Sequence, residues 1–212
     1  MRHACYLPPP SFRADAAPLG RHWPSLKYDD ALLLPAEARP GADEALLALS
    51  GVAARDALCS GALSAASYAA ALLRRARDTR CVNAWAAIDP LKVVSEAAAV
   101  DARFAAGADT RPLCGMPVAF KDVFDVVGYP TVSGPPALEG FYPPFSSDLV
   151  LRVQAAHGVV LGKLRNHEVQ SGKRSLLDPF ISRPTQLGGG DTTVNPVYGP
   201  TLNPHNVTHT GS

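Results

Sequence analysis

A lysine that follows a short apolar run is the residue of this sequence best placed to do chemistry. Lys121 comes directly after residues 118–120, Val-Ala-Phe, and before Asp122, where a buried strand is expected to end. A lysine at a strand end is usually a solvated surface charge. In a partly desolvated pocket, however, burial disfavours the protonated amine, so the lysine can act as a base near neutral pH and activate a serine. Spacing alone does not choose between these two interpretations.

The elements before Lys121 are predicted to be helices. Residues 43–61 predict one or two short helices that end at Gly61, and Ser64 is the predicted N-cap of a helix that continues to about residue 80. A further helix is expected over 91–107, where Val93, Ala97, Val100 and Phe104 form one apolar stripe and Gly107 ends the helix. We interpret these apolar positions as core packing.

The elements around Lys121 predict an α/β unit. The strand at 118–120 is expected to continue through Val123, Phe124, Val126 and Val127 until Gly128 turns the chain. Ser147 is then expected to cap a helix whose inward-facing residues are Leu149, Val153 and Ala156. Gly158 is expected to end this helix, and a second buried strand is expected at 159–162. Strands alternating with helices indicate an α/β layer structure.

The composition argues against several classes of partner. The 212 residues include 20 basic and 19 acidic side chains, a net charge of +1, so neither nucleic acid nor an anionic membrane is an expected partner. No segment approaches the roughly 20 apolar residues of a membrane span, and the N-terminal apolar patch is too short for a signal peptide. We therefore expect a cytoplasmic protein. The cysteines at 5, 59, 81 and 114 form no CxxC pair, and we expect them to be reduced thiols.

Other polar residues suggest weaker sites. His205 and His209 could share a metal only on a helix, and Asn203-Pro204 before them indicates a loop; His167-Glu168 is equally weak. The sequence LGGGD lacks the Gly-Lys-Ser/Thr ending of a phosphate loop. We therefore expect neither a metal nor a cofactor.

Three stretches resemble the amidase signature family of serine hydrolases. CGMPVAFKDVFDVVGYPTVSGPPALEGF resembles the first signature, which runs Gly-x-Pro-x-x-x-Lys-Asp and then Asp-x-x-Gly-x-Pro-Thr. SSDLVLRVQAAHGVVLGKLRNHE resembles the helix and strand that lead to Gly-Lys and His-Glu, and NPVYGPTLNPHN resembles the Asn-Pro stretch that follows. The resemblance covers residues 45–212, more weakly over the helices at 45–107.

The resemblance implies a fold, an activity and a role for Lys121. The fold is a single mixed sheet flanked by helices, of which this chain would supply the N-terminal part. The activity is hydrolysis of linear carboxylic amide C–N bonds by a Ser-Ser-Lys triad, with a small-molecule amide as substrate. Lys121 would draw a proton, through a bridging serine on a cis peptide bond, from the serine that attacks the carbonyl. A glutamine-dependent amidotransferase subunit, which needs partner subunits, and a non-catalytic truncated product are the alternatives; a homo-oligomer is also open.

The sequence departs from the family pattern near its C-terminal end. In the family, the Asn-Pro stretch runs into a Gly-Ser-rich segment with the bridging serine, and the nucleophile follows later. Ser212 matches the bridging serine only with a gap, so it is not assigned. We expect this polypeptide alone to be inactive, because the nucleophile is missing, and to be prone to aggregation through exposed sheet edges and apolar faces.

Residues 169–186 are a second departure, within an amidase part that we assign to residues 43–212. Deleting VQSGKRSLLDPFISRPTQ would leave HELGGGDTTVNPVYGP, which fits the family without a gap. A retained intron and an ordinary surface loop both explain this insertion. Residues 1–42, rich in proline, are expected to form an extended arm.

Overall fold

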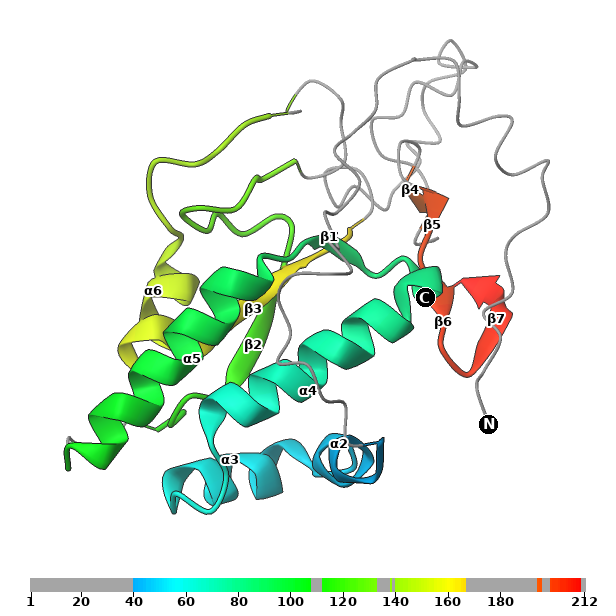
Figure 1. Cartoon of the computed structure of the whole chain (residues 1–212). Helices are drawn as coiled ribbons and strands as arrows, with labels where there is room; N and C mark the ends of the chain where they lie inside the picture. The colour runs from blue at the N-terminus through cyan, green and yellow to red at the C-terminus, as the bar shows by residue number, and fades with distance from the viewer. Residues whose placement is uncertain are drawn as a thin grey trace, which may run out of the picture.

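The structure, a computed structural model, describes residues 40–107, 112–132, 138, 140–166, 194–195 and 199–210 (Figure 1). The predicted insertion at 169–186 lies outside these residues, and so does the predicted N-terminal arm up to residue 39. The first helix begins at Pro40, within the segment assigned to that arm.

Residues 40–105 are mainly helical, as predicted. The helices are α2 (Pro40–Leu47), α3 (Gly51–Cys59), α4 (Ala65–Asp78), the 3₁₀ turn η1 (Arg80–Val82) and α5 (Pro90–Ala105). Residues 43–61 therefore contribute to two short helices. The predicted cap of α4 is confirmed, because the Ser64 hydroxyl accepts a hydrogen bond of 3.3 Å from the backbone N–H of Ser67. Gly107, just after α5, has a φ of +71°, which glycine adopts without strain.

A three-stranded mixed sheet lies against these helices. Its strands are β1 (Trp85–Ala87), β2 (Pro117–Lys121) and β3 (Val159–Leu164). The order is β1-β3-β2, with β2 parallel and β1 antiparallel to β3 (Figure 1). Helix α6 (Asp148–Ala155) lies in the connection between the parallel strands β2 and β3. The predicted α/β class and the mixed sheet are confirmed.

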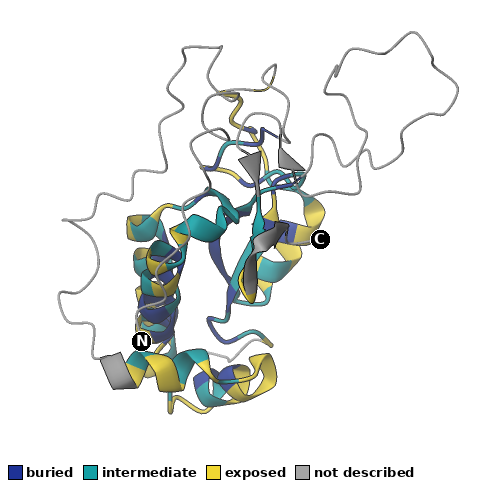
Figure 2. Cartoon of the chain, turned by 90° about the vertical axis from the view of Figure 1, so that its right-hand side faces the viewer, coloured by how far each residue is buried: buried dark blue, intermediate teal, exposed yellow. Residues whose placement is uncertain are grey.

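The two apolar clusters of the core share strand β3. The helix-side core joins α3, α4 and α5 to β3, and its buried members include Leu58, Leu73, Val93, Val159 and Leu161. The loop-side core packs the segment after β2 and helix α6 against the strands, and its buried members are Ala87, Phe120, Val126, Tyr129, Val150 and Val160. In Figure 2 the dark blue, buried positions lie within the helices and the sheet, and yellow, exposed positions lie on the outer surfaces of the helices.

Two details of the predicted α/β unit are wrong. Strand β2 ends at Lys121, because the Phe124 N–H donates 3.0 Å to the Lys121 carbonyl and turns the chain. Val126 still joins the core, but from a loop rather than a strand. In α6 the buried residue is Val150, whereas Leu149 is 46% exposed. The helix presents the face with Val150 and Val153 to the loop-side core, which turns Leu149 away from it.

The remaining described strands form two small antiparallel pairs. They are β4 (Val194–Asn195) with β5 (Gly199–Pro200), and β6 (Leu202–Asn203) with β7 (Asn206–Thr210). The Thr201 hydroxyl donates 3.1 Å to the Asn83 carbonyl, which ties the second pair to the residue after η1. None of the helices in the described ranges is long and apolar enough to span a bilayer.

The expectation of reduced thiols is wrong for this structure. Cys59, the last residue of α3, forms a disulfide with Cys114, which lies in the turn before β2. The two Cα atoms are 5.1 Å apart although 55 residues separate them in sequence. Cys81 is disulfide-bonded as well. Only the packing of α3 beside the start of β2 brings the first pair together, and the spacing of cysteines in the sequence carries no sign of it.

Candidate active site

Lys121 lies where the sequence predicted it, at the carboxyl end of a strand. It is the last residue of β2 and pairs with Leu164, the last residue of β3. Because β2 and β3 are parallel, both strands end at the same edge of the sheet, which is where α/β proteins usually bind their ligands. The side chain of Lys121 is exposed, so the partly desolvated pocket expected around it is not formed by the described residues.

The backbone next to Lys121 is held on both sides. Its carbonyl accepts from Phe124, and the N–H of the next residue, Asp122, donates 2.9 Å to the Leu164 carbonyl. The parallel ladder therefore continues one residue past the lysine. These bonds hold the Cα of Lys121 at the sheet edge while its side chain extends into solvent.

A buried ion pair beside Lys121 was not predicted from the sequence. The Lys163 ammonium lies 3.0 Å from Oδ1 of Asp122, and the two side chains are 0% and 5% exposed. Lys163 also donates 3.1 Å to the Pro130 carbonyl and 3.1 Å to the Thr131 hydroxyl. The second carboxylate oxygen of Asp122 accepts 3.2 Å from the Val132 N–H. A lysine within the apolar run VVLGKL was the available signal, since a buried charge requires a partner.

Lys92 of α5 contacts the loop at residues 127–129, which leads to the ion pair. Lys92 of α5 lies 4.7 Å from the centre of the Tyr129 ring and donates 2.9 Å to the Val127 carbonyl. Burial, and then the nearby carboxylates of Glu96 and Asp89, raise the pKa of the Tyr129 hydroxyl above its ordinary range. The predicted turn at Gly128 is confirmed, with a φ of +84°.

Of the weaker candidate sites, only His205 and His209 lie within the described residues. His205 lies in the turn of the β6–β7 hairpin, where its N–H donates 2.9 Å to the Asn203 side chain, so the predicted loop is confirmed. His209 lies in β7. Across the described ranges, no group of three or more metal-ligating residues could hold an ion. His167-Glu168, LGGGD and Ser212 lie outside those ranges.

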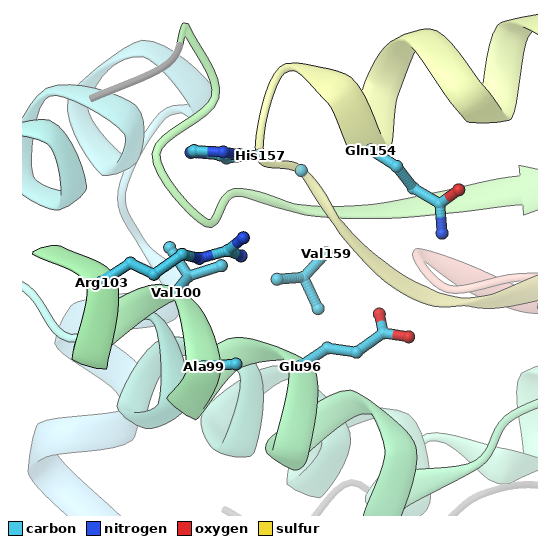
Figure 3. Close-up of a pocket in the computed structure, with 8 residues that line it drawn as sticks. Glu96, Ala99, Val100, Arg103, Gln154, His157 and Val159 are labelled. Carbon is cyan, nitrogen blue, oxygen red and sulfur yellow. The ribbon is translucent and has the colours of Figure 1, made fainter. Parts of the chain in front are cut away.

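A hollow of about 180 Å³ lies at the opposite end of the parallel strands. Its polar lining residues are Glu96 and Arg103 of α5, with Gln154 and His157 at the end of α6. Figure 3 shows Arg103 and His157 at one side and Glu96 and Gln154 at the other. Val159, the first residue of β3, also lines the hollow, whereas Lys121 pairs with the last residue of that strand. This hollow is therefore separate from the sheet edge that carries Lys121.

Comparison with known proteins identifies a family whose match includes Lys121. The Amidase family profile matches residues 68–176, just over half of the chain. The chain belongs to the amidase family. The A subunit of glutamyl-tRNA(Gln) amidotransferase from Salinispora arenicola is 38% identical over 161 residues, which are 71% of this chain and 32% of that protein. Its counterpart from Acidothermus cellulolyticus is 37% identical over 123 residues, 58% of this chain and 21% of that protein.

Solved structures show the amidase signature fold in the same way. A structure described as a vestigial protein complex, which reveals the origins of an s-triazine catabolic enzyme, is 30% identical with a TM-score of 0.63. It matches 75% of this chain and 31% of its own. Peptide amidase from Stenotrophomonas maltophilia, 24% identical with a TM-score of 0.64, matches 77% of this chain and 31% of its own and supports the fold alone. This amidase-family chain thus spans between a fifth and a third of the length of these relatives.

Proposed function

We propose that Lys121 is the general base of a Ser-Ser-Lys amide hydrolase, and that this chain supplies the lysine-bearing part of that enzyme. The observation that carries the proposal is the position of Lys121 at the carboxyl end of β2, inside the segment that matches the amidase family. The substrate class is a small carboxylic amide, and the bond broken is its C–N bond.

In this mechanism the amine of Lys121 must be unprotonated before it can act as a base. The Lys121 amine takes a proton, relayed by a bridging serine, from a nucleophilic serine whose oxygen attacks the amide carbonyl. The C–N bond breaks as the leaving nitrogen receives that proton, and water then hydrolyses the acyl-serine ester. Because Lys121 is exposed among the described residues, further parts of an amidase domain must cover it before its charged form is disfavoured.

A subunit of a glutamine-dependent amidotransferase is the second candidate function. It is favoured by the relatives at 37% and 38% identity, both named as the A subunit of glutamyl-tRNA(Gln) amidotransferase. Such a protein would need partner subunits, whereas a free-standing amidase would act alone or as a homo-oligomer. A cytoplasmic location stays part of the proposal for either function. The disulfide between Cys59 and Cys114 weighs against it, because such bonds persist mainly in oxidising compartments.

The deciding experiment begins with the spliced transcript, sequenced across the codons of His167-Glu168 and past Ser212. A message that reads HELGGGDTT and continues into serine codons encodes a complete hydrolase, which is then assayed on a panel of primary carboxylic amides. Lys121→Ala should lower kcat/KM by roughly 10⁴-fold or more, since members of a catalytic triad act as a unit. Lys92→Ala is the matched control, because that lysine packs on Tyr129 rather than at the sheet edge.

Two results would overturn the proposal. Lys121→Ala with undiminished hydrolysis would remove the lysine from the mechanism. A message that stops after Ser212 would make this chain a non-catalytic product, whatever its relatives do. Hydrolysis that appears only when other subunits are added would favour the amidotransferase instead.

A further inference from the structure

An irregularity in the sheet determines which face Lys163 occupies. Residues that pair across a ladder point to the same face, and successive residues of a strand alternate between faces. Val160 pairs with Val118, and after an extra residue in β3 the next pairs are Ala119 with Gly162 and Phe120 with Lys163. The extra residue shifts the alternation, so Lys163 lies on the face of Phe120 and Val160 rather than on the face of Leu161. A charged amine is thereby placed in the loop-side core.

The cost of burying this amine is offset by two hydrogen bonds and one ion contact. Lys163 has three ammonium hydrogens and lies within 3.1 Å of three oxygens, from Asp122, Pro130 and Thr131. A buried ion pair is expensive to desolvate and is often replaceable by apolar side chains without loss of stability. Stability alone is therefore a weak explanation for the ion pair.

The position of the ion pair suggests a different role. Asp122 is the residue immediately after Lys121, and a neighbouring carboxylate favours the protonated form of a lysine. Both oxygens of Asp122 are engaged inside the protein, one by the Lys163 ammonium and the other by the Val132 N–H. Within the described ranges, no ion pair involves Lys121 itself, although its side chain is exposed and long enough to turn toward a neighbour.

We propose that Lys163 is a positioning residue for Lys121: it holds the Asp122 carboxylate in the core, so that Asp122 does not pair with the adjacent lysine. The inference rests on the proposed role of Lys121 as a base, because a base must be available without its proton. Lys163 itself touches no substrate. It acts only through Asp122.

The test measures the reactivity of the Lys121 amine in the 212-residue chain, without any hydrolysis assay. Trace acetylation with acetic anhydride at pH 8, followed by peptide mass spectrometry, gives the rate at Lys121 relative to the reference amine of Lys92. In Lys163→Met we expect this relative rate to fall by about threefold or more, because Asp122 becomes a counter-ion for Lys121. In Asp122→Asn with Lys163→Met, which has neither charge, we expect it to return to within about twofold of the wild-type value.

The double variant separates charge from structure. A merely structural role for Lys163 would leave the Lys121 rate low in both variants, and that result would overturn the proposal. An unchanged rate in a folded Lys163→Met chain, with circular dichroism like that of the wild type, would overturn it too. Should Lys163→Met fail to fold, Lys163→Gln keeps an N–H donor without a charge and should give the same threefold fall.

This outcome is independent of the proposed function. The acetylation rates report on Lys121 whether or not the chain belongs to a working hydrolase. Unchanged rates would remove the positioning role of Lys163 and leave Lys121 as the proposed base. Full amide hydrolysis by Lys121→Ala would instead remove the base itself, with no bearing on the measured rates.

Discussion

The carboxylate of Asp101, in the C-terminal half of α5, accepts a hydrogen bond of 2.7 Å from the hydroxyl of Ser64, the N-cap of α4. The same carboxylate accepts from the backbone N–H groups of Ala65 at 2.8 Å and Ala66 at 3.0 Å. One helix therefore satisfies N–H groups at the start of another, at the end where the helix dipole favours a negative charge. Helices α4 and α5 are joined by this polar contact as well as by the helix-side core.

Loss of this cap should destabilise the chain measurably. Asp101→Ala leaves two N–H groups and one hydroxyl without their acceptor, and we expect a loss of about 2 kcal/mol in the free energy of unfolding. Urea denaturation followed by circular dichroism measures it. Asp56→Ala is the control, because the Asp56 ion pair with Arg55 is exposed and should contribute little. Equal losses in the two variants would contradict the role of the cap.

The attachment of α2 to α4 should depend on pH. Arg74 makes a bidentate ion pair with Asp43, in which Nη2 of Arg74 donates a hydrogen bond of 2.7 Å to Oδ1 of Asp43. These hydrogen bonds lower the pKa of Asp43 below its ordinary value. A lowered folded-state pKa means that stability is present above the unfolded pKa, about 3.9, and is lost as the pH falls through the folded value.

The expected result is a difference between wild type and Asp43→Asn that disappears in acid. The side chain of Asp43 is 16% exposed and that of Arg74 is 11% exposed, so the pair should contribute about 1 kcal/mol at pH 7 and nothing once the pH lies below the folded-state pKa of Asp43. Parallel urea titrations from pH 7 to pH 2.5 give the two curves. A difference that stays constant over this range would show that the carboxylate charge of Asp43 does not contribute.

The disulfide should be a large part of the stability of the isolated chain. The chain-entropy relation for a cross-link between residues 55 apart gives about 4 kcal/mol, which would be lost on reduction. Intact-mass measurement after alkylation, with and without reductant, establishes whether Cys59 and Cys114 are bonded in the purified protein. Denaturation of the wild type and of a Cys59→Ser, Cys114→Ser double variant, both without reductant, gives the free-energy difference for this bond alone, because reductant would also open the disulfide of Cys81. Free thiols before reduction would restore the expectation of reduced cysteines.

Gly162 should not tolerate a side chain. Its φ is +153°, and a Cβ built there would lie 2.6 Å from the carbonyl oxygen of Ala87 in β1. Gly162→Ala must separate β1 from β3 or distort the irregular pairing beside Lys163, and we expect a loss of about 2 kcal/mol or more.

Gly51→Ala is the matched control for that substitution. A Cβ at Gly51, the first residue of α3, meets no atom within 4 Å, so alanine should be neutral or stabilising by about 0.5 kcal/mol. Thermal unfolding of the two variants side by side checks both expectations. A Gly162→Ala chain as stable as Gly51→Ala would show that β1 and β3 do not approach as closely as the structure indicates.

Local signals in the sequence were enough to predict several elements of the fold. Ser64 caps α4 because a hydroxyl at that position bonds an N–H three residues later, and the stripe of Val93, Ala97 and Val100 is buried because apolar spacing reports directly on a helix face. The same reasoning failed at Leu149 and beyond Lys121. An apolar run can enter a core from a loop, and a short helix can present either of two apolar faces.

The order of amino acids was enough to predict an alternation of strands and helices, a strand end at Lys121, and a resemblance of the surrounding residues to an amidase. These features depend on spacing and residue type within short segments. The ion pair of Lys163 with Asp122 and the disulfide of Cys59 with Cys114 depend instead on tertiary packing. The two residues of the ion pair are 41 positions apart in the sequence, and the two cysteines are 55 positions apart. Both contacts form because strands pair and helices pack, and a pattern within a short segment cannot predict such long-range contacts.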